Sequence, residues 1–170
     1  MPVQRLNHAV LFVRDVDRSA AFYREVLGFR VKVEMPGRAV FLQAEGSTND
    51  HDLGLFAVGE QAGASGAGRS TVGLYHLAWE VDTLGELARI RGALAEAGAL
   101  TGASDHATTK ALYAQDPDGI EFEVSWLLPA DLITPAIEAQ GATTRALDLA
   151  GEIARYGADT RGGVGVSTPV

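Results

Sequence analysis

Three side chains that could hold a metal ion stand out in the sequence. His8 and His76 lie in two similar segments, LNHAVLFV and LYHLAWEV, at an offset of 76 − 8 = 68 residues. A carboxylate, either Glu121 or Glu123, lies in the late segment IEFEVSW. Two imidazoles and one carboxylate with open coordination positions are typical of non-haem Fe(II) sites, and Mn(II) also tolerates them. A single strand histidine is usually an ordinary core or surface residue, so the hypothesis depends on the combination in a chain with 4 histidines.

Composition narrows the chemistry of such a site. The chain has no cysteine, so a metal would be held by imidazole and carboxylate groups alone. With 22 acidic and 14 basic residues, the net charge of −8 repels phosphate backbones and anionic membranes. We therefore expect neither nucleic acid nor membrane as a partner. The absence of a long apolar run and of a signal-like start favours a cytoplasmic location.

Two copies of one pattern organise the chain. Residues 6–13 are predicted to form a strand that is followed by a helix over residues 15–27. Residues 74–81 repeat the strand, and a helix follows them over residues 84–97. The 68-residue offset favours two fused supersecondary modules over a solenoid. We predict an α+β fold in which two tandem βαβββ modules form a curved, partly closed mixed sheet around a metal-binding cavity.

The remaining segments give the predicted boundaries. Further strands are expected at residues 29–35, 39–44, 53–58, 111–115 and 120–126, and the second strand of the later module has the weakest pattern. The predicted domain covers residues 1–128, with modules at about 4–58 and 72–128 joined by the Gly/Ser-rich linker 59–71. Residues 129–170 are interpreted as a C-terminal extension with a short amphipathic helix over 143–156, through Leu147, Leu149 and Ile153, and a disordered tail at 162–170.

Strand alternation indicates which side chains share a face. Leu6, His8, Val10 and Phe12 lie on one face of the first strand. On the last strand Glu121, Glu123 and Ser125 lie opposite Ile120, Phe122, Val124 and Trp126, whose face should pack on the helices. A buried carboxylate needs a cation or a hydrogen-bonded partner. Alternation alone does not distinguish Glu121 from Glu123.

These motifs resemble those of the vicinal oxygen chelate superfamily of glyoxalases, bleomycin resistance proteins, fosfomycin resistance transferases and extradiol dioxygenases. The resemblance is carried by LNHAVLFVRDVDRSAAFYREVLGFRV, LYHLAWEV and ALYAQDPDGIEFEVSW, and it covers about residues 6–126. In that superfamily the metal-binding glutamate lies four residues after the glycine of the turn, which here is Gly119 and selects Glu123. The symmetric position, near Leu55 because 123 − 68 = 55, is apolar, so the resemblance implies three protein ligands.

Within the superfamily, the segment DHATTKALYAQDPDG looks most like that of the catechol 2,3-dioxygenase-type extradiol branch. The resemblance implies that His106 acts as an acid, a base or an oxygen-stabilising group near the substrate, and that Tyr113 donates a hydrogen bond to a substrate oxygen. The alternatives are an ordinary loop histidine and a core tyrosine. Many two-domain extradiol enzymes carry a further histidine shortly before the second ligand. The sequence GEQAGASGAGRSTVGLY has none, and His51 lies far upstream.

The resemblance implies an extradiol dioxygenase that uses Fe(II) and O2, with Mn(II) as a substitute, to cleave a small aromatic diol. A homodimer is expected by the same analogy. One alternative is a metal-dependent transferase or isomerase of the same fold, such as a fosfomycin thiol transferase or a glyoxalase-like enzyme. A phosphonate would require basic residues, and Lys110 and Arg38 are the obvious candidates. A second alternative is a metal-free module that binds or sequesters a small molecule, although such proteins generally lack the three ligands.

Overall fold

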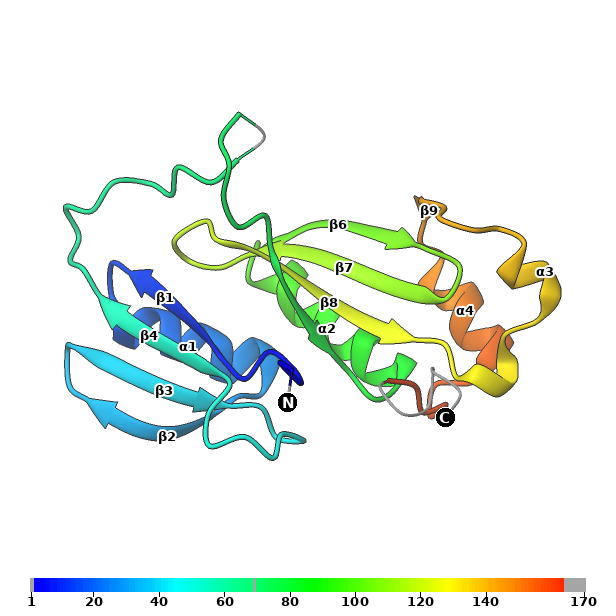
Figure 1. The fold of residues 1–170 in the computed structure, drawn as a ribbon, viewed down its shortest axis with the longest axis horizontal. Coiled ribbons are helices and arrows are strands. Elements are labelled where there is room, and N and C mark those ends of the chain that lie inside the picture. The colour runs from blue at the N-terminus through cyan, green and yellow to red at the C-terminus, as the bar shows by residue number, and fades with distance from the viewer. Residues whose placement is uncertain (1, 69, 164–170) are drawn as a thin grey trace. The chain divides into compact units, whose positions relative to one another are not determined.

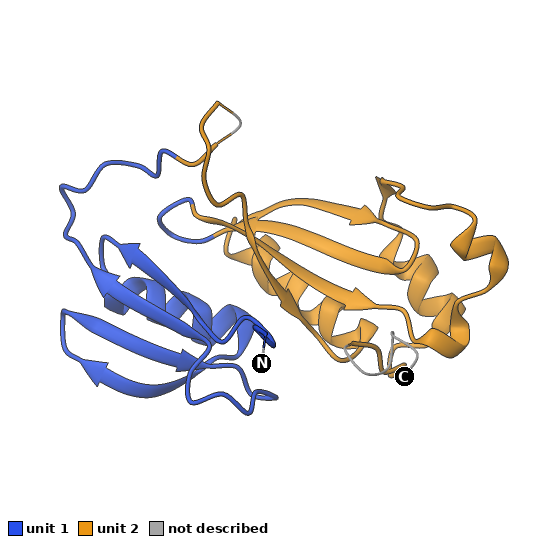
Figure 2. Cartoon of the chain, viewed as in Figure 1, with its two compact units in different colours: residues 1–66, 116–119 blue, residues 67–115, 120–170 orange. Residues whose placement is uncertain are grey.

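The computed structural model describes residues 2–68 and 70–163, and the chain divides into two compact units (Figures 1 and 2). Unit 1 contains Met1–Gly66 together with Asp116–Gly119, and unit 2 contains Ala67–Gln115 together with Ile120–Val170. Each unit carries one mixed β-sheet, and neither sheet closes into a barrel within the described residues. The predicted α+β fold of two βαβββ modules is therefore confirmed.

Unit 1 is built from one helix and four strands. Its elements are β1 (Ala9–Val13), α1 (Val16–Leu27), β2 (Arg30–Met35), β3 (Ala39–Gln43) and β4 (Leu53–Ala57), with the strand order β1-β4-β3-β2. Strand β1 pairs with β4 in parallel, and the other pairs are antiparallel. Helix α1 begins after Asp15 because that side chain accepts hydrogen bonds from the backbone N–H groups of Asp17 and Arg18. It ends at Gly28, whose φ of 76° is a left-handed conformation that glycine adopts without strain.

The core of unit 1 lies between α1 and one face of the sheet. Leu11, Leu53 and Leu55 are buried on that face, and Ala20 and Tyr23 of α1 are buried with them. The opposite face is more open, since Val10 and Phe12 of β1 are exposed. The predicted alternation along the first strand is thus confirmed, and it leaves the face that continues from His8 uncovered by helix α1.

Unit 2 repeats this arrangement and adds an edge strand. Its elements are β5 (Leu77–Glu80), α2 (Leu84–Glu96), β6 (Leu100–Asp105), β7 (Thr109–Gln115) and β8 (Glu121–Leu127). With the edge strand β9 (Arg145–Ala146), the sheet order is β5-β8-β7-β6-β9. Phe122, Val124 and Trp126 are almost fully buried, as the alternation along the last strand predicted. Strand β6 has no alternating apolar pattern, and a register shift interrupts its pairing with β7 between Leu100 and Gly102.

The C-terminal extension is folded against unit 2 as far as the structure describes it. It contains a 3-10 turn (Ala130–Leu132), α3 (Pro135–Glu138), β9 (Arg145–Ala146) and α4 (Leu149–Tyr156). The predicted helical segment 143–156 is wrong in its first part, because β9 pairs with β6 there and Asp148 caps a helix that begins at Leu149. Of the predicted disordered tail, residues 164–170 lie outside the described residues, while the Gly162 N–H donates to the carbonyl of Asp82. No helix in the described part of the chain is long and apolar enough to span a membrane.

Candidate active site

The two predicted histidine ligands occupy equivalent places in the two modules. His8 directly precedes β1 and His76 directly precedes β5, and the two strands begin 77 − 9 = 68 residues apart. Each of these strands pairs in parallel with the last strand of its module, β4 or β8. The repeat inferred from the sequence therefore holds in the sheet topology, including the position of each histidine at the start of its first strand.

In unit 2, four residues form a row in register across the sheet. Ala78 of β5 pairs with Glu123 of β8, Glu123 pairs with Tyr113 of β7, and Tyr113 pairs with Gly102 of β6. Paired residues project from the same face of a sheet, so Glu123 lies beside Tyr113 on the face opposite α2. Gly102 lies beside the tyrosine ring, and a Cβ there would meet Cδ2 of Tyr113 at an ordinary van der Waals distance of 3.7 Å.

His76 and Glu123 have the geometry that two ligands of one metal ion would need. The Nε2 atom of His76 lies 3.4 Å from Oε2 of Glu123, and both side chains are mostly buried. Ligand atoms about 2.1 Å from an ion and at right angles to each other lie about 3 Å apart. The buried Nδ1 atom of His76 has no hydrogen-bond partner in the described residues, so this imidazole lacks the acceptor that usually orients a metal-bound histidine. The imidazole nitrogen of His76 and the carboxylate oxygen of Glu123 are ligand atoms that fit a hard or borderline divalent cation such as Fe(II) or Mn(II).

Tyr113 connects this pair to His106. Its hydroxyl lies 2.8 Å from Nε2 of His106, and the rings of His76 and Tyr113 have centroids 6.1 Å apart. Burial raises the pKa of Tyr113, and the negative charge of Glu123 and a hydrogen bond to that carboxylate raise it further. The hydroxyl thus stays protonated near neutral pH, and its single proton can be donated either to Glu123 or to His106. These four side chains are brought together within unit 2.

In unit 1, His8 lies beside a second histidine. The ring of His51 is 4.5 Å from that of His8 and 5.0 Å from that of Phe41. The Nδ1 atom of His8 is 2.8 Å from Oδ1 of Asn7, and Nδ1 of His51 is 3.0 Å from a carboxylate oxygen of Asp50. That hydrogen bond and charge of His51 lower the pKa of Asp50. His51 lies next to the predicted ligand because β4 runs beside β1, which is a tertiary pairing that sequence spacing alone does not contain.

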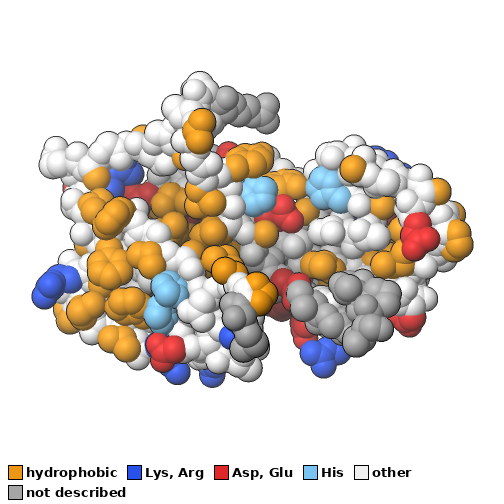
Figure 3. All heavy atoms as spheres, viewed as in Figure 1, with side chains coloured by type: hydrophobic (Ala, Val, Ile, Leu, Met, Phe, Trp, Pro, Cys, Tyr) orange, Lys and Arg blue, Asp and Glu red, His pale blue; other side chains and the backbone are white. Residues whose placement is uncertain are grey.

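The face of unit 1 that continues from His8 is apolar. Val10, Gly54, Phe41 and Val33 form a row in register across β1, β4, β3 and β2, and this row is the counterpart of Ala78, Glu123, Tyr113 and Gly102 in unit 2. Apolar side chains gather over this unit in Figure 3. The counterpart of Glu123 is thus Gly54 rather than the Leu55 inferred from the repeat offset, since Leu55 projects into the core. Neither position 54 nor position 55 carries a carboxylate.

The structure therefore brings together His76, Glu123, Tyr113 and His106 in unit 2, while His8 belongs to unit 1. Among residues 2–68 and 70–163, no group of three or more His, Asp or Glu side chains is arranged to hold a metal ion. The ligand set of His8, His76 and Glu123 stays a prediction.

Two βαβββ modules, each with one mixed sheet whose first and last strands pair in parallel, match the vicinal oxygen chelate class of fold. A family model of the glyoxalase/bleomycin resistance protein/dioxygenase superfamily matches residues 5–124, and the chain belongs to that superfamily. A glyoxylase/bleomycin resistance protein/dioxygenase domain from a Frankia species superposes with a TM-score of 0.62 at 25% identity, covering 73% of this chain and 92% of that one. A fosfomycin resistance protein from Listeria monocytogenes shares the fold with a TM-score of 0.54 at 14% identity, covering 73% of this chain and 93% of that one.

Two curated relatives carry dioxygenase names. The catechol-2,3-dioxygenase of Bacillus subtilis is 34% identical over 119 residues, which are 70% of this chain and 40% of that protein. Metapyrocatechase 2 of Cupriavidus necator is 30% identical over 95 residues, which are 56% of this chain and 26% of that protein. The chain thus spans less than half the length of either relative.

Proposed function

We propose that this protein is an Fe(II)-dependent extradiol dioxygenase that cleaves the ring of a small catechol-type substrate with O2. His8, His76 and Glu123 would hold the metal, and Mn(II) could replace Fe(II) in the same ligand set. The observation that carries the proposal is the contact series His76–Glu123–Tyr113–His106 in unit 2, which joins two predicted ligands to the two predicted catalytic residues. The resemblance to two dioxygenases supports the same assignment.

Each residue of this series would have a separate role in the proposed reaction. Bound Fe(II) would supply the one-electron chemistry that allows dioxygen to react with a catechol. Tyr113 keeps its proton because its pKa is raised, so its hydroxyl can donate a hydrogen bond to a substrate oxygen. Nε2 of His106, 2.8 Å from that hydroxyl, can accept a proton from the substrate and return it later. No external reductant is required, because both atoms of O2 enter the product.

A phosphonate-binding transferase is a weaker candidate. Such an enzyme needs basic side chains that can reach an anionic substrate. Lys110 is 2% exposed, and its ammonium group is engaged by Asp105 at 2.6 Å and Glu152 at 3.0 Å. Arg38 lies in the turn between β2 and β3 of unit 1 and is exposed. Lys110 is therefore held by carboxylates of its own unit and does not offer a phosphonate site.

The proposal is tested by reconstituting the protein with Fe(II) under anaerobic conditions and then adding air and a panel of catechols. We expect stoichiometric iron and a yellow ring-cleavage product, whereas thiol transfer would give no colour. Replacing His8, His76 or Glu123 with Ala should abolish iron binding. Glu121→Gln is the matched control, because Glu121 lies on the same strand two residues away.

Two results would contradict the proposal. Full iron retention by one of the three alanine variants would remove that residue from the site. A wild-type protein that binds iron but cleaves no catechol would leave a transferase, an isomerase or a binding module as the alternatives. The homodimer that we also propose is tested by sedimentation, which should give the mass of two chains.

A further inference from the structure

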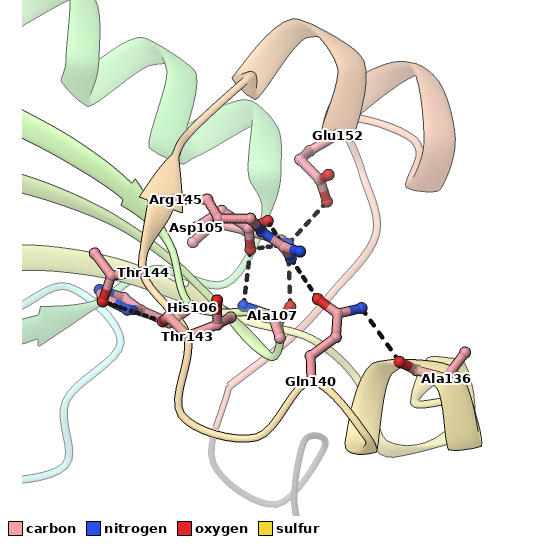
Figure 4. Close-up of polar contacts among 10 residues, drawn as sticks. Asp105, His106, Ala107, Ala136, Gln140, Thr143, Thr144, Arg145 and Glu152 are labelled. Carbon is pink, nitrogen blue, oxygen red and sulfur yellow. Dashed lines mark hydrogen bonds and ion pairs between the residues drawn. The ribbon is translucent and has the colours of Figure 1, made fainter.

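The C-terminal extension contacts the proposed catalytic histidine directly. The carbonyl oxygen of Thr143 lies 2.8 Å from Nδ1 of His106, and the hydroxyl of Thr144 lies 3.3 Å from the same atom (Figure 4). Both threonines precede β9 and belong to the segment that follows the predicted domain 1–128.

The contact determines where the proton of a neutral His106 lies. A backbone carbonyl can only accept a hydrogen bond, so Nδ1 must carry the hydrogen. A neutral imidazole then has its lone pair on Nε2, the atom that faces the hydroxyl of Tyr113. The Thr144 hydroxyl can accept a weaker bond from the same N–H or point its own hydrogen elsewhere, so it does not oppose this assignment.

Two interactions hold the carbonyl of Thr143 in place. Strand β9 pairs with the end of β6, which aligns Arg145 with Asp105. The guanidinium group of Arg145 donates to Oδ2 of Asp105 at 3.1 Å and also bonds to the side-chain oxygen of Gln140. Arg145 therefore links Gln140, at the start of the segment 140–145, to Asp105, the last residue of the strand before His106 (Figure 4).

We propose that the C-terminal extension is a positioning element of the active site, in which Arg145 holds the Thr143 carbonyl so that His106 keeps its proton on Nδ1 and its acceptor atom toward Tyr113. The contacts that fix the Nδ1–H tautomer of His106 all lie within unit 2, so this part of the proposal does not depend on the proposed function. The effect on turnover rests on the proposed dioxygenase function, because only there does Nε2 accept a substrate proton. Arg145 and Thr143 act through His106 and touch no substrate.

The test compares Arg145→Ala with Arg91→Ala in the full-length chain. Arg91 is an exposed arginine of α2, on an element that does not pair with β9, so it controls for the loss of one surface charge. Histidine labelled with 15N, observed before iron is added and at about pH 8.5 where imidazoles are ordinarily neutral, reports which ring nitrogen of His106 carries hydrogen. The His106 signals are assigned by their absence from His106→Gln.

We expect the wild type and Arg91→Ala to show the Nδ1–H form alone, and Arg145→Ala to show a mixture of both tautomers. With iron and catechol, Arg145→Ala should have a kcat about two- to fivefold lower, the effect of losing one exposed ion pair, with unchanged iron content and KM. Arg145→Lys, which keeps the charge, should recover most of the loss.

An Nε2–H form in the wild type would overturn the proposal. So would an Arg145→Ala protein whose His106 tautomer matches that of Arg91→Ala, whatever its turnover. If the wild type cleaves no catechol, the dioxygenase assignment fails while the tautomer measurement still decides the positioning role.

Discussion

Replacing Lys110 with Met should destabilise unit 2 because two partly buried carboxylates lose the cation that compensates them. Lys110 is 2% exposed, and its ammonium group donates hydrogen bonds to Asp105 at 2.6 Å and to the carbonyl of Ala107 at 3.0 Å, while Glu152 forms an ion pair with it at 3.0 Å. Methionine has a similar shape but no charge, so the substitution leaves two carboxylates that are 14% and 16% exposed without their cation. Breaking a fully buried pair in this way costs about 3–5 kcal/mol.

The loss of unfolding free energy expected for Lys110→Met is smaller than that for a fully buried ion pair. Both carboxylates keep some contact with water, and Asp105 also retains Arg145 at 3.1 Å. We therefore expect the free energy of unfolding to fall by about 2–4 kcal/mol. For a chain of this size that corresponds to a melting temperature lower by about 5–15 °C. Thermal and urea unfolding followed by circular dichroism measure both quantities.

The pH dependence gives a second measurement of the same interaction. Burial by itself would raise the pKa of Asp105, but its hydrogen bond to Lys110 and the charge of that residue outweigh burial and lower the pKa overall. A carboxyl group with a lowered folded-state pKa contributes stability above its unfolded pKa, and this contribution is lost as the pH falls through the folded value. The difference between wild type and Lys110→Met should therefore be largest near pH 7 and should shrink below about pH 4.

Two further variants control this experiment. Lys32→Met removes an exposed lysine of β2 and should change stability by less than about 0.5 kcal/mol. The double variant Lys110→Met/Glu152→Gln removes one of the uncompensated charges and should recover part of the loss. A Lys110→Met protein as stable as the wild type at pH 7, or one with an equal deficit at every pH, would refute the reasoning.

Three other predictions concern single contacts. His106→Ala should keep its iron but lose turnover by about 10–100-fold, measured by ring cleavage, and unchanged turnover would reduce the residue to a structural role. Asp118→Asn weakens the ion pair with Arg14 at 2.8 Å and should lower the unfolding free energy at pH 7 by about 1–3 kcal/mol. Burial opposes the lowered pKa of Asp118 but its arginine partners dominate, so urea titrations should show that this deficit shrinks in acid. Tyr23→Phe removes a hydroxyl 3.2 Å from Asp116 and should cost about 1–2 kcal/mol in urea unfolding, and a neutral result would show that the hydroxyl contributes no net stability.

Much of the fold could be predicted because its signals are local. Helix α1 has an N-capping aspartate and a C-terminal glycine within one readable segment, and the observed helix Val16–Leu27 differs from the predicted range 15–27 by one residue. The last strand alternates strictly, so Phe122 and Val124 are buried while Glu123 lies on the other face. Local patterns of this kind depend only on the periodicity of the chain.

Other elements depend on contacts that no local pattern contains. Strand β6, LTGASD, has no apolar alternation and is held by its ladder with β7. Strand β9 forms because two residues pair with the edge of β6, whereas the sequence pattern predicts a helix over the whole of 143–156. The Thr143 contact to His106 is made by a backbone carbonyl, which every residue type provides, so side-chain patterns cannot reveal it.

The two rows of paired residues explain how one repeated module can give two sheet faces with different chemistry. Glu123 and Tyr113 in unit 2 correspond to Gly54 and Phe41 in unit 1, and each pair is directly opposed across two neighbouring strands. A carboxylate at position 54 would provide a fourth ligand candidate, and a Cβ there would lie 3.4 Å from the ring of Phe41, at the short end of ordinary van der Waals contact. With Gly54 and Phe41 at these positions the face is apolar instead of charged. The sequence difference between Glu123 with Tyr113 and Gly54 with Phe41 gives a carboxylate beside the histidine of unit 2 and an apolar row in the equivalent place of unit 1.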